Sequence, residues 1–400
     1  MHNFCSLAAM LRGNDKSSSA WLPYNNVKLV RGGREYFSLL TRLIGLAQHS
    51  IHLQVYIYED DETGRLVGTA LMEAAKRGVK VYLLTDGYAS KELSAGFIKE
   101  LNTAGVHFRF FEPLLKSEHF YFGRRMHHKV LVVDGHFALV GGINISNRYN
   151  DIRDEPAWLD WALYMEGPAA GALFKICTDV WARPGQMMLK RLLRNNLPGF
   201  PNTGHTPLRI RRNDWVKSKN QISRSYIDML KKASSNVIIM SGYFLPGSII
   251  RHHLSRAAKR NIDIQVIVAG KSDVPLAKHA ERYMYRWLLK RNIKLYEYTR
   301  AVLHGKMATR DKKWVTIGSY NINDISAYAS VELNIDVNDA DFAIQVQEKL
   351  EAVIKNDCVL VTVEGYNKKY NFLQRFIQFC SYWLVRVIVY LFTFYFKQSR

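Results

Sequence analysis

The sequence predicts an α/β fold built from two similar repeats, each a mixed, largely parallel sheet flanked by helices, related by a pseudo-twofold axis. Two observations support this prediction. One motif of five fixed residue types occurs twice with identical intervals, and the apolar patterns around it recur in the same order. The two copies of this His-Lys motif are His127-x-Lys129-x4-Asp134-x6-Gly141-Gly142-x-Asn144 and His304-x-Lys306-x4-Asp311-x6-Gly318-Ser319-x-Asn321.

Upstream of each motif, apolar runs typical of buried strands alternate with helix-like segments. In the first repeat we expect a strand, the end of a helix, and two further strands, at residues 51–58, 74–77, 81–84 and 105–111. The second repeat shows the same order, at residues 237–244, 257–260, 265–268 and 292–298. Strands joined through helices favour parallel pairing in an α/β sheet.

The motif itself predicts a hairpin. Residues 130–133 and 138–140 are rich in strand formers, and Asp134-Gly135 is a turn signal between them. A histidine and a lysine two residues apart project from the same face of an extended strand. A lysine can hold a phosphate oxygen, and a histidine can attack phosphorus or protonate a leaving oxygen. Each motif therefore supplies half of a two-histidine site, and we expect the halves to meet at the interface between repeats.

A lone His-x-Lys pair is more typical of an ordinary surface strand, but duplication with glycine and asparagine at fixed offsets favours a functional site. The glycines allow close backbone approach, and Asn144 and Asn321 offer amide donors to the same phosphate oxygens. Asp134 and Asp311 belong to the predicted catalytic set, and bracing the motif turn is their expected role. A zinc site at His127-His128 is not expected, because neighbouring strand residues face opposite ways.

These residues resemble the phospholipase D superfamily, whose signature is this motif, and within it the bacterial cardiolipin synthases. The resemblance extends over roughly residues 25–365. Its supporting segments outside the motifs include Tyr56-Ile57-Tyr58, Arg77-Gly78-Val79-Lys80-Val81, Asp86-Gly87 and Tyr243-Phe244-x-Pro246.

The resemblance implies catalysis without a metal or cofactor, through a covalent phosphohistidine. By analogy with the family, His127 is the nucleophile and His304 is the general acid and base. Asp160 and Glu332 stand where the family places the carboxylates that orient these histidines. Charge on the pentacoordinate phosphorus would be stabilised by Lys129, Lys306, Asn144 and Asn321.

The composition indicates an anionic partner. Lys and Arg number 56 against 35 Asp and Glu, which gives a net charge of +21. A field of this sign attracts nucleic acid or anionic lipid, and charge alone does not choose between them.

The C-terminal segment favours lipid. Residues 376–396 are 21 mostly apolar residues with Arg386 as their only formal charge. As a helix they would be about 30 Å long, enough to span a bilayer core. A central arginine costs roughly 2.5–3.5 kcal/mol on insertion scales, and basic flanks with many aromatic residues suit an interface. We therefore expect association with the membrane surface, in its plane or as a tail anchor, rather than a helix docked on the protein, and nucleic acid is not the expected partner.

The N-terminus has no secretory signal pattern and the four cysteines show no paired spacing, so we expect the cytoplasmic side of the cell membrane. The predicted division is a first repeat at residues 1–200, a second at 206–365 and a membrane-associated segment at 366–400. Residues 195–206 are the expected linker, and residues 114–125, which have no counterpart before the second motif, are an expected cover over the site.

The leading hypothesis is a cardiolipin synthase, in which the hydroxyl of an anionic phospholipid, phosphatidylglycerol, replaces a phospholipid headgroup. Three alternatives stay open on these residues. A phospholipase D would admit water and release phosphatidic acid, a nuclease of the same superfamily would use the basic surface for a nucleic acid backbone, and a degenerate scaffold would only bind lipid.

Overall fold

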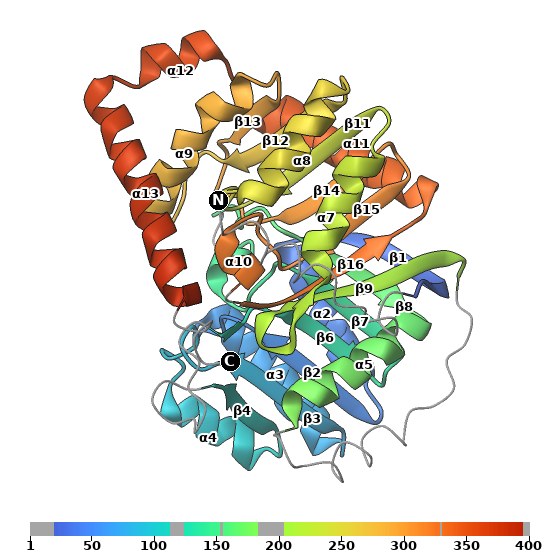
Figure 1. Ribbon diagram of the computed structural model, residues 1–400. Coiled ribbons are helices and arrows are strands. Elements are labelled where there is room, and N and C mark those ends of the chain that lie inside the picture. Colours follow the sequence, from blue (N-terminus) through green and yellow to red (C-terminus); the bar gives the residue numbers. More distant parts are fainter. Residues whose placement is uncertain (1–19, 113–123, 153–154, 183–203, 329, 395–400) are drawn as a thin grey trace.

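The computed structural model describes residues 20–112, 124–152, 155–182, 204–328 and 330–394, and all structural statements below concern these residues. They form two sheets, one from each repeat, packed face to face with helices on their outer sides (Figure 1). The expected linker at 195–206 and the expected cover at 114–125 lie almost entirely outside the described residues, so both stay predictions, as do the domain boundaries.

The sheet of the first repeat has the strand order β4-β3-β2-β6-β7-β8-β1. β2, β3 and β4 pair in parallel, and among these seven strands only β6 and β8 run against the others. The strands are β1 (Leu22–Arg31), β2 (Ser50–Val55), β3 (Lys80–Asp86), β4 (His107–Phe111), β6 (Lys129–Val133), β7 (Phe137–Gly141) and β8 (Trp161–Glu166).

The sheet of the second repeat has the equivalent order β13-β12-β11-β14-β15-β16-β9, extended by β17 beside β13 and by the short β10 beside β9. Its strands are β9 (Thr206–Asp214), β10 (Lys219–Asn220), β11 (Asn236–Ser241), β12 (Asp263–Ala269), β13 (Lys294–Tyr298), β14 (Lys306–Arg310), β15 (Trp314–Gly318), β16 (Ser330–Val337) and β17 (Cys358–Val361). The register also matches, because Lys129 lies opposite Val55 and Lys306 lies opposite Ser241 at equivalent ends of the hairpins.

Alternation along the strands places one side of each sheet against helices and the other against its partner sheet. In β6, Leu131 and Val133 enter the outer core of the first repeat, whereas Val130 and Val132 enter a central core shared by both repeats. The outer helices are α2 (Arg34–Leu46), α3 (Glu62–Lys76) and α4 (Ala95–Thr103) in the first repeat, and α7 (Gln221–Lys232), α8 (Ser248–Lys259) and α9 (Pro275–Leu289) in the second. The central core also holds α5 (Pro168–Trp181) and α11 (Ala340–Asp357).

These elements confirm the predicted α/β class and its two-repeat organisation. The repeats are also joined through their backbones, since β1 pairs with β9 and the two-residue β5 (Arg125–Met126) pairs in parallel with β16. The remaining elements are the short helices η2 (Asn147–Tyr149), η3 (Trp215–Lys217), α10 (Asp324–Tyr328) and α12 (Val363–Lys369), and the long C-terminal α13 (Phe372–Phe394).

The position of α13 corrects one expectation. The segment was expected at the membrane surface, in its plane or as a tail anchor, rather than docked on the protein, yet α13 lies along α9 at the edge of the molecule (Figure 1). Tyr382 is buried there against Ala280 and Met284 of α9, and its ring also contacts the ring of Tyr283. Among the helices of the described residues, none is sufficiently long and apolar to cross a membrane.

Candidate active site

The two motif histidines are held in place by the backbone of the opposite repeat. The His127 N–H donates to the carbonyl of Val331 at 2.9 Å, and the His304 N–H donates to the carbonyl of Leu159 at 2.8 Å. Val331 and Leu159 are the residues immediately before Glu332 and Asp160. Each histidine is therefore fixed beside a carboxylate that belongs to the other half of the chain.

The side chains follow this crossed arrangement. His127 Nδ1 donates to Glu332 Oε2 at 2.9 Å, across 205 residues of sequence, and His304 Nδ1 donates to Asp160 Oδ2 at 2.6 Å, across 144 residues. Both carboxylates are fully buried, with 1% or less of their surface exposed. The two predicted histidine–carboxylate pairs are thus formed between the repeats, and neither repeat contains a complete pair.

This geometry sets the tautomer of both rings. His127 Nδ1 has a second acceptor, the Ser319 carbonyl at 3.1 Å, so this nitrogen must carry a proton. Asp160 makes the same demand on His304 Nδ1 from 2.6 Å, while Lys306 Nζ lies 2.9 Å from the same nitrogen. The Nε2 atom of each neutral imidazole is then left with its lone pair, which is the form that can attack phosphorus or accept a proton.

The two lysines lie in the same buried region. Lys129 Nζ donates to the His127 carbonyl at 2.9 Å, and Lys306 Nζ donates to the carbonyl of His304. Burial lowers the pKa of Lys129 well below its ordinary value. Burial also lowers the pKa of Lys306, to about 8, although Asp160 and Glu332 oppose the shift. The two lysines thus place their amino groups close to the two histidines, where a phosphodiester could accept hydrogen bonds from them.

The electrostatics bring both motifs into one site. Burial lowers the pKa of His127, and Lys306 of the other motif contributes to that shift. Burial, Lys306 and Lys129 together lower the pKa of His304 well below its ordinary value. Burial raises the pKa of Asp160 to about 6, so this carboxylate is still ionised at neutral pH. The site thus holds two histidines with lowered pKa values beside two buried carboxylates.

The glycine and serine positions of the motif are shaped by the carboxylates. A Cβ atom at Gly142 would lie 2.4 Å from Asp160 Oδ2, so this position excludes any side chain. At the equivalent Ser319, the hydroxyl donates to Glu332 instead. The difference between Gly-Gly and Gly-Ser in the two motifs therefore reflects how closely each carboxylate approaches the motif turn.

The motif asparagines are buried and bound on their acceptor side. Asn144 Oδ1 accepts from the Ile57 N–H at 3.1 Å, and its amide group donates to the Tyr149 hydroxyl at 2.9 Å. Asn321 Oδ1 accepts from the Tyr243 N–H at 3.3 Å. These bonds hold each asparagine against the residues that follow a neighbouring strand.

The motif aspartates lie at the far ends of the strands, away from the histidines. Asp134 accepts from the backbone N–H groups of Gln48, His49 and Ser50 at 2.7–2.9 Å. Asp311 accepts equivalent bonds from residues 234–236, and these outweigh its partial burial and lower its pKa. Seven residues of extended chain correspond to roughly 23 Å, so a phosphate at a histidine is beyond their reach. This geometry favours bracing of the turn as their role.

Several residues around the histidines were not singled out from the sequence. The rings of Tyr149 and Trp158 lie 5.2 and 6.0 Å from the ring of His304. Tyr56, named from the sequence only within a family-like segment, contacts His127 edge-on, with the ring centroids 4.7 Å apart. Asp86 accepts from the Met126 N–H at 2.9 Å and so holds the strand that precedes His127. Tyr149 and Trp158 follow the first motif without any spacing signal, and for that reason only the structure reveals them.

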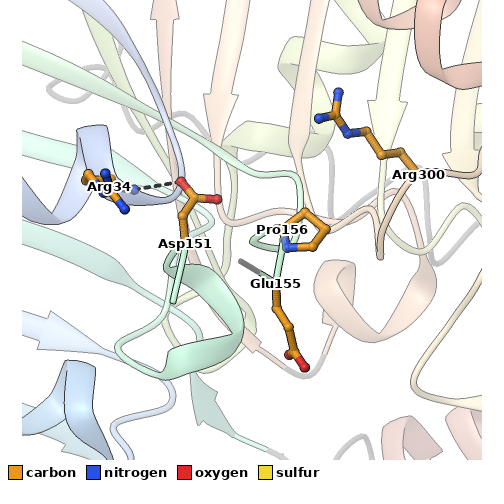
Figure 2. A pocket seen from close by; sticks show the side chains of 5 residues that line it. All are labelled: Arg34, Asp151, Glu155, Pro156 and Arg300. Atoms are coloured by element: carbon orange, nitrogen blue, oxygen red, sulfur yellow. Dashed lines mark hydrogen bonds between the residues drawn. The ribbon is translucent and has the colours of Figure 1, made fainter. Parts of the chain in front are cut away.

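A pocket of about 320 Å³ opens close to this region, lined by Arg34, Asp151, Glu155, Pro156 and Arg300. Figure 2 shows Asp151 bonded to the backbone of Arg34, with Pro156 between Asp151 and Arg300. Its lining comes from both repeats, but it contains none of the predicted catalytic residues. His128 also lies outside the site, since it turns away and bonds Gln54 at 3.0 Å.

Comparison with known proteins agrees with this geometry. A family model described as "Cardiolipin synthase, PLD-like domain" matches residues 40–162 and 226–354. Cardiolipin synthase B of Salmonella typhimurium is 35% identical over 345 residues, which cover 84% of this chain and 82% of the relative. Cardiolipin synthase B of Escherichia coli is 33% identical over 346 residues, which cover 85% and 83%.

The chain belongs to the phospholipase D superfamily. Within the superfamily it falls in the cardiolipin synthase family, and it is accordingly an enzyme of the phosphatidyltransferase class. The fold agrees, because the crystal structure of phosphatidylserine synthase from Haemophilus influenzae superposes with a TM-score of 0.72 at 14% identity, covering 94% of this chain and 97% of that one.

The buried lysines of this phospholipase D-type site predict an unusual pH dependence. A lysine that binds phosphate must be protonated, and Lys306 has its pKa lowered to about 8. Activity should therefore be present below pH 8 and lost as the pH rises through 8, rather than near 10.5. On the acid side, the lowered pKa of His127 places the loss of activity below pH 6.5.

The measurement is a profile of kcat/KM against pH, which reports groups of the free enzyme. In Lys306→Arg the lowered pKa of Lys129 still limits the alkaline limb, so the limb should move upward fully only in the double variant Lys129→Arg/Lys306→Arg, because guanidinium groups stay protonated. An alkaline limb that stays at pH 8 in the double variant would show that another group causes it.

Proposed function

We propose that this chain synthesises cardiolipin by transferring a phosphatidyl group to phosphatidylglycerol through a covalent phosphohistidine. The observation that carries the proposal is the crossed arrangement, in which Glu332 and Asp160 orient His127 and His304 so that both Nε2 atoms are available. A two-step transfer needs one imidazole as nucleophile and a second as acid and base, and this site has one of each.

In the first step, Nε2 of His127 attacks phosphorus and the bond from phosphorus to the headgroup oxygen breaks. Protonated His304 gives its Nε2 proton to that oxygen, so the headgroup leaves as a neutral alcohol. In the second step, a hydroxyl of phosphatidylglycerol attacks phosphorus, its proton passes to His304, and the bond to His127 breaks. The net reaction exchanges one phosphodiester for another and needs no cofactor.

The lysines and asparagines would stabilise the transition state. Lys129 and Lys306 now donate to backbone carbonyls of their own strands, and a phosphodiester would replace these neutral acceptors by charged ones. The amide groups of Asn144 and Asn321 would add donors to the same oxygens. A bound anion also raises the pKa of both histidines, which makes protonated His304 accessible for the first step.

Burial of the site favours transfer over hydrolysis. Lys129, Lys306 and His304 expose 2%, 1% and 7% of their surface, so little room is left for bulk water beside phosphorus. A hydroxyl delivered by a second lipid then competes well with water for the phosphohistidine.

The proposed setting is the cytoplasmic face of the cell membrane, with the protein bound peripherally and anionic phospholipid as its partner. The net charge of +21 supports this setting, since a basic surface is attracted to anionic headgroups.

Lipid product analysis tests this function. The full chain is incubated with phosphatidylglycerol vesicles, with and without phosphatidylethanolamine, in excess chelator, and the products are identified by mass spectrometry. We expect cardiolipin, with glycerol released when phosphatidylglycerol is also the donor, and none with His127→Ala prepared in parallel. Phosphatidic acid alone would mean a hydrolase. Cleavage of oligonucleotides without lipid turnover would mean a nuclease.

A further inference from the structure

Helix α13 packs on the protein with polar residues on its inner side. Gln378 and Ser381 are buried, and Gln378 accepts a hydrogen bond from the hydroxyl of Tyr366 at 2.7 Å. Tyr382 completes the contact, in a cluster with Met284 of α9. A surface helix of a water-soluble protein normally buries its apolar side and exposes its polar side.

The outward side of α13 is a stripe of large apolar residues. Each of its six main members exposes between 44% and 60% of its surface: Phe376, Phe379, Trp383, Leu384, Val387 and Leu391. Their intervals are three or four residues, except for the adjacent Trp383 and Leu384, and this spacing places them on one face over most of the helix. A continuous exposed patch of this kind indicates an apolar environment on that side.

The end of this outer stripe lies close to the active site. Arg386 forms an ion pair with Asp324 of α10 at 3.5 Å, and α10 begins three residues after Asn321. Leu245 packs against the α9–α13 cluster and lies two residues after Tyr243, whose N–H binds Asn321. Figure 1 shows α13 running beside α9 down to α10, where the two repeats meet. This part of α13 therefore lies close to the segments that carry and contact the motif of the second repeat.

The charges beside the outer stripe are positive. Arg286 and Lys290 are exposed on the last turns of α9, and Lys368 and Lys369 are exposed at the end of α12. Lys368 and Lys369 lie three or four residues before the start of α13, in a chain with a net charge of +21. Apolar residues flanked by exposed cations match the acyl region and the headgroups of an anionic bilayer.

We propose that α13 stays docked on α9 while its outer stripe enters the interface of an anionic phospholipid bilayer, so that the helix lies in the membrane plane and holds the mouth of the site at the lipid surface. This proposal rests on the proposed function for its choice of lipid, and it adds which face binds and how the site is oriented. A phosphatidylglycerol molecule then reaches the buried lysines and histidines without leaving the lipid layer.

The test compares Leu384→Glu on the stripe with Leu66→Glu on α3, since the two leucines expose 49% and 50% of their surface. Both are made in the full chain, outside the catalytic machinery, and circular dichroism checks that they fold. Binding is measured by flotation with phosphatidylglycerol vesicles and with phosphatidylcholine vesicles. We expect Leu384→Glu to lose about ten-fold or more in binding to phosphatidylglycerol vesicles, and Leu66→Glu to bind like the wild type.

Turnover separates this proposal from the proposed function. On vesicles, Leu384→Glu should lose activity in parallel with binding, whereas on short-chain phosphatidylglycerol below its micelle concentration it should keep wild-type activity. If no lipid is turned over but vesicle binding still depends on Leu384, the proposed function is wrong and the proposed membrane contact of α13 is supported.

Three outcomes would overturn the membrane face. Wild-type vesicle binding by Leu384→Glu would show that the stripe is not the contact. A dimer in sedimentation velocity that Leu384→Glu dissociates would show that a second copy of the chain covers the stripe. Retention in the membrane after alkaline extraction would exclude a helix that lies at the surface.

Discussion

Replacing His127 by alanine is expected to lower cardiolipin formation by at least about 10⁴-fold, and replacing His304 by alanine is expected to do the same. The reason differs between the two histidines. Without His127 no covalent bond to phosphorus forms. Without His304 the headgroup alcohol leaves without a proton and the acceptor hydroxyl keeps its own. Mass spectrometry of the lipid products measures both losses.

A substrate whose leaving group needs no proton distinguishes the two roles. With phosphatidyl-p-nitrophenol, His304→Ala should still release one equivalent of p-nitrophenolate and accumulate a phosphatidyl adduct on the peptide that contains His127. His127→Ala should give no burst and no adduct. Peptide mapping at neutral pH, where a phosphohistidine survives, locates the adduct. An adduct on His304 in the His127→Ala protein would reverse the assignment.

The second large effect concerns the carboxylates, and it depends on their crossed pairing. Glu332→Gln and Asp160→Asn keep the shape of the side chain but remove the charge that fixes the histidine tautomer. A loss of about 10²- to 10⁴-fold in turnover is expected for each, as for carboxylates that orient catalytic histidines elsewhere. Glu332→Gln should slow the burst of p-nitrophenolate, because Glu332 orients His127. Asp160→Asn should spare the burst and slow breakdown of the adduct, because Asp160 orients His304.

Ring nitrogen shifts in protein labelled with ¹⁵N-histidine test the pairing independently of the reaction. Glu332→Gln should change the tautomer signals of His127 and leave those of His304 in place, and Asp160→Asn should do the reverse. Thermal unfolding of both variants serves as the control for general damage. If each carboxylate instead perturbs the histidine of its own repeat, the crossed arrangement is wrong.

Much of this architecture follows from local sequence. The strand-forming residues at 130–133 predicted a strand, and the observed β6 is buried on both faces, one in each core. The turn signal at Asp134-Gly135 predicted the hairpin, and Asp134 adopts the positive φ of 51° that the turn needs. The helix-linked order of the apolar runs predicted the parallel pairing of β2, β3 and β4. Such features depend on residues that are close in the chain, so their period and spacing are visible in the sequence.

The C-terminal segment shows the limit of that reasoning. Its apolar composition predicted association with a membrane rather than with the protein, yet the helix docks on α9 with Gln378 and Ser381 inward. Composition shows how apolar a helix is, but it does not show whether the helix contacts lipid or another part of the protein. The α9 residues that contact the helix lie about 100 positions earlier in the chain, and only tertiary packing brings the two helices together.

By itself, the sequence determined which reactive side chains this protein carries and that it has two repeats. Both follow from the two copies of the His-Lys motif at identical spacing. The tertiary structure alone decided which groups act together. Glu332 serves His127 and Asp160 serves His304 because the two repeats pack face to face, so each histidine meets the strand of the opposite repeat. Contacts across 205 and 144 residues leave no periodic trace in the sequence, since they depend on how two folded sheets meet.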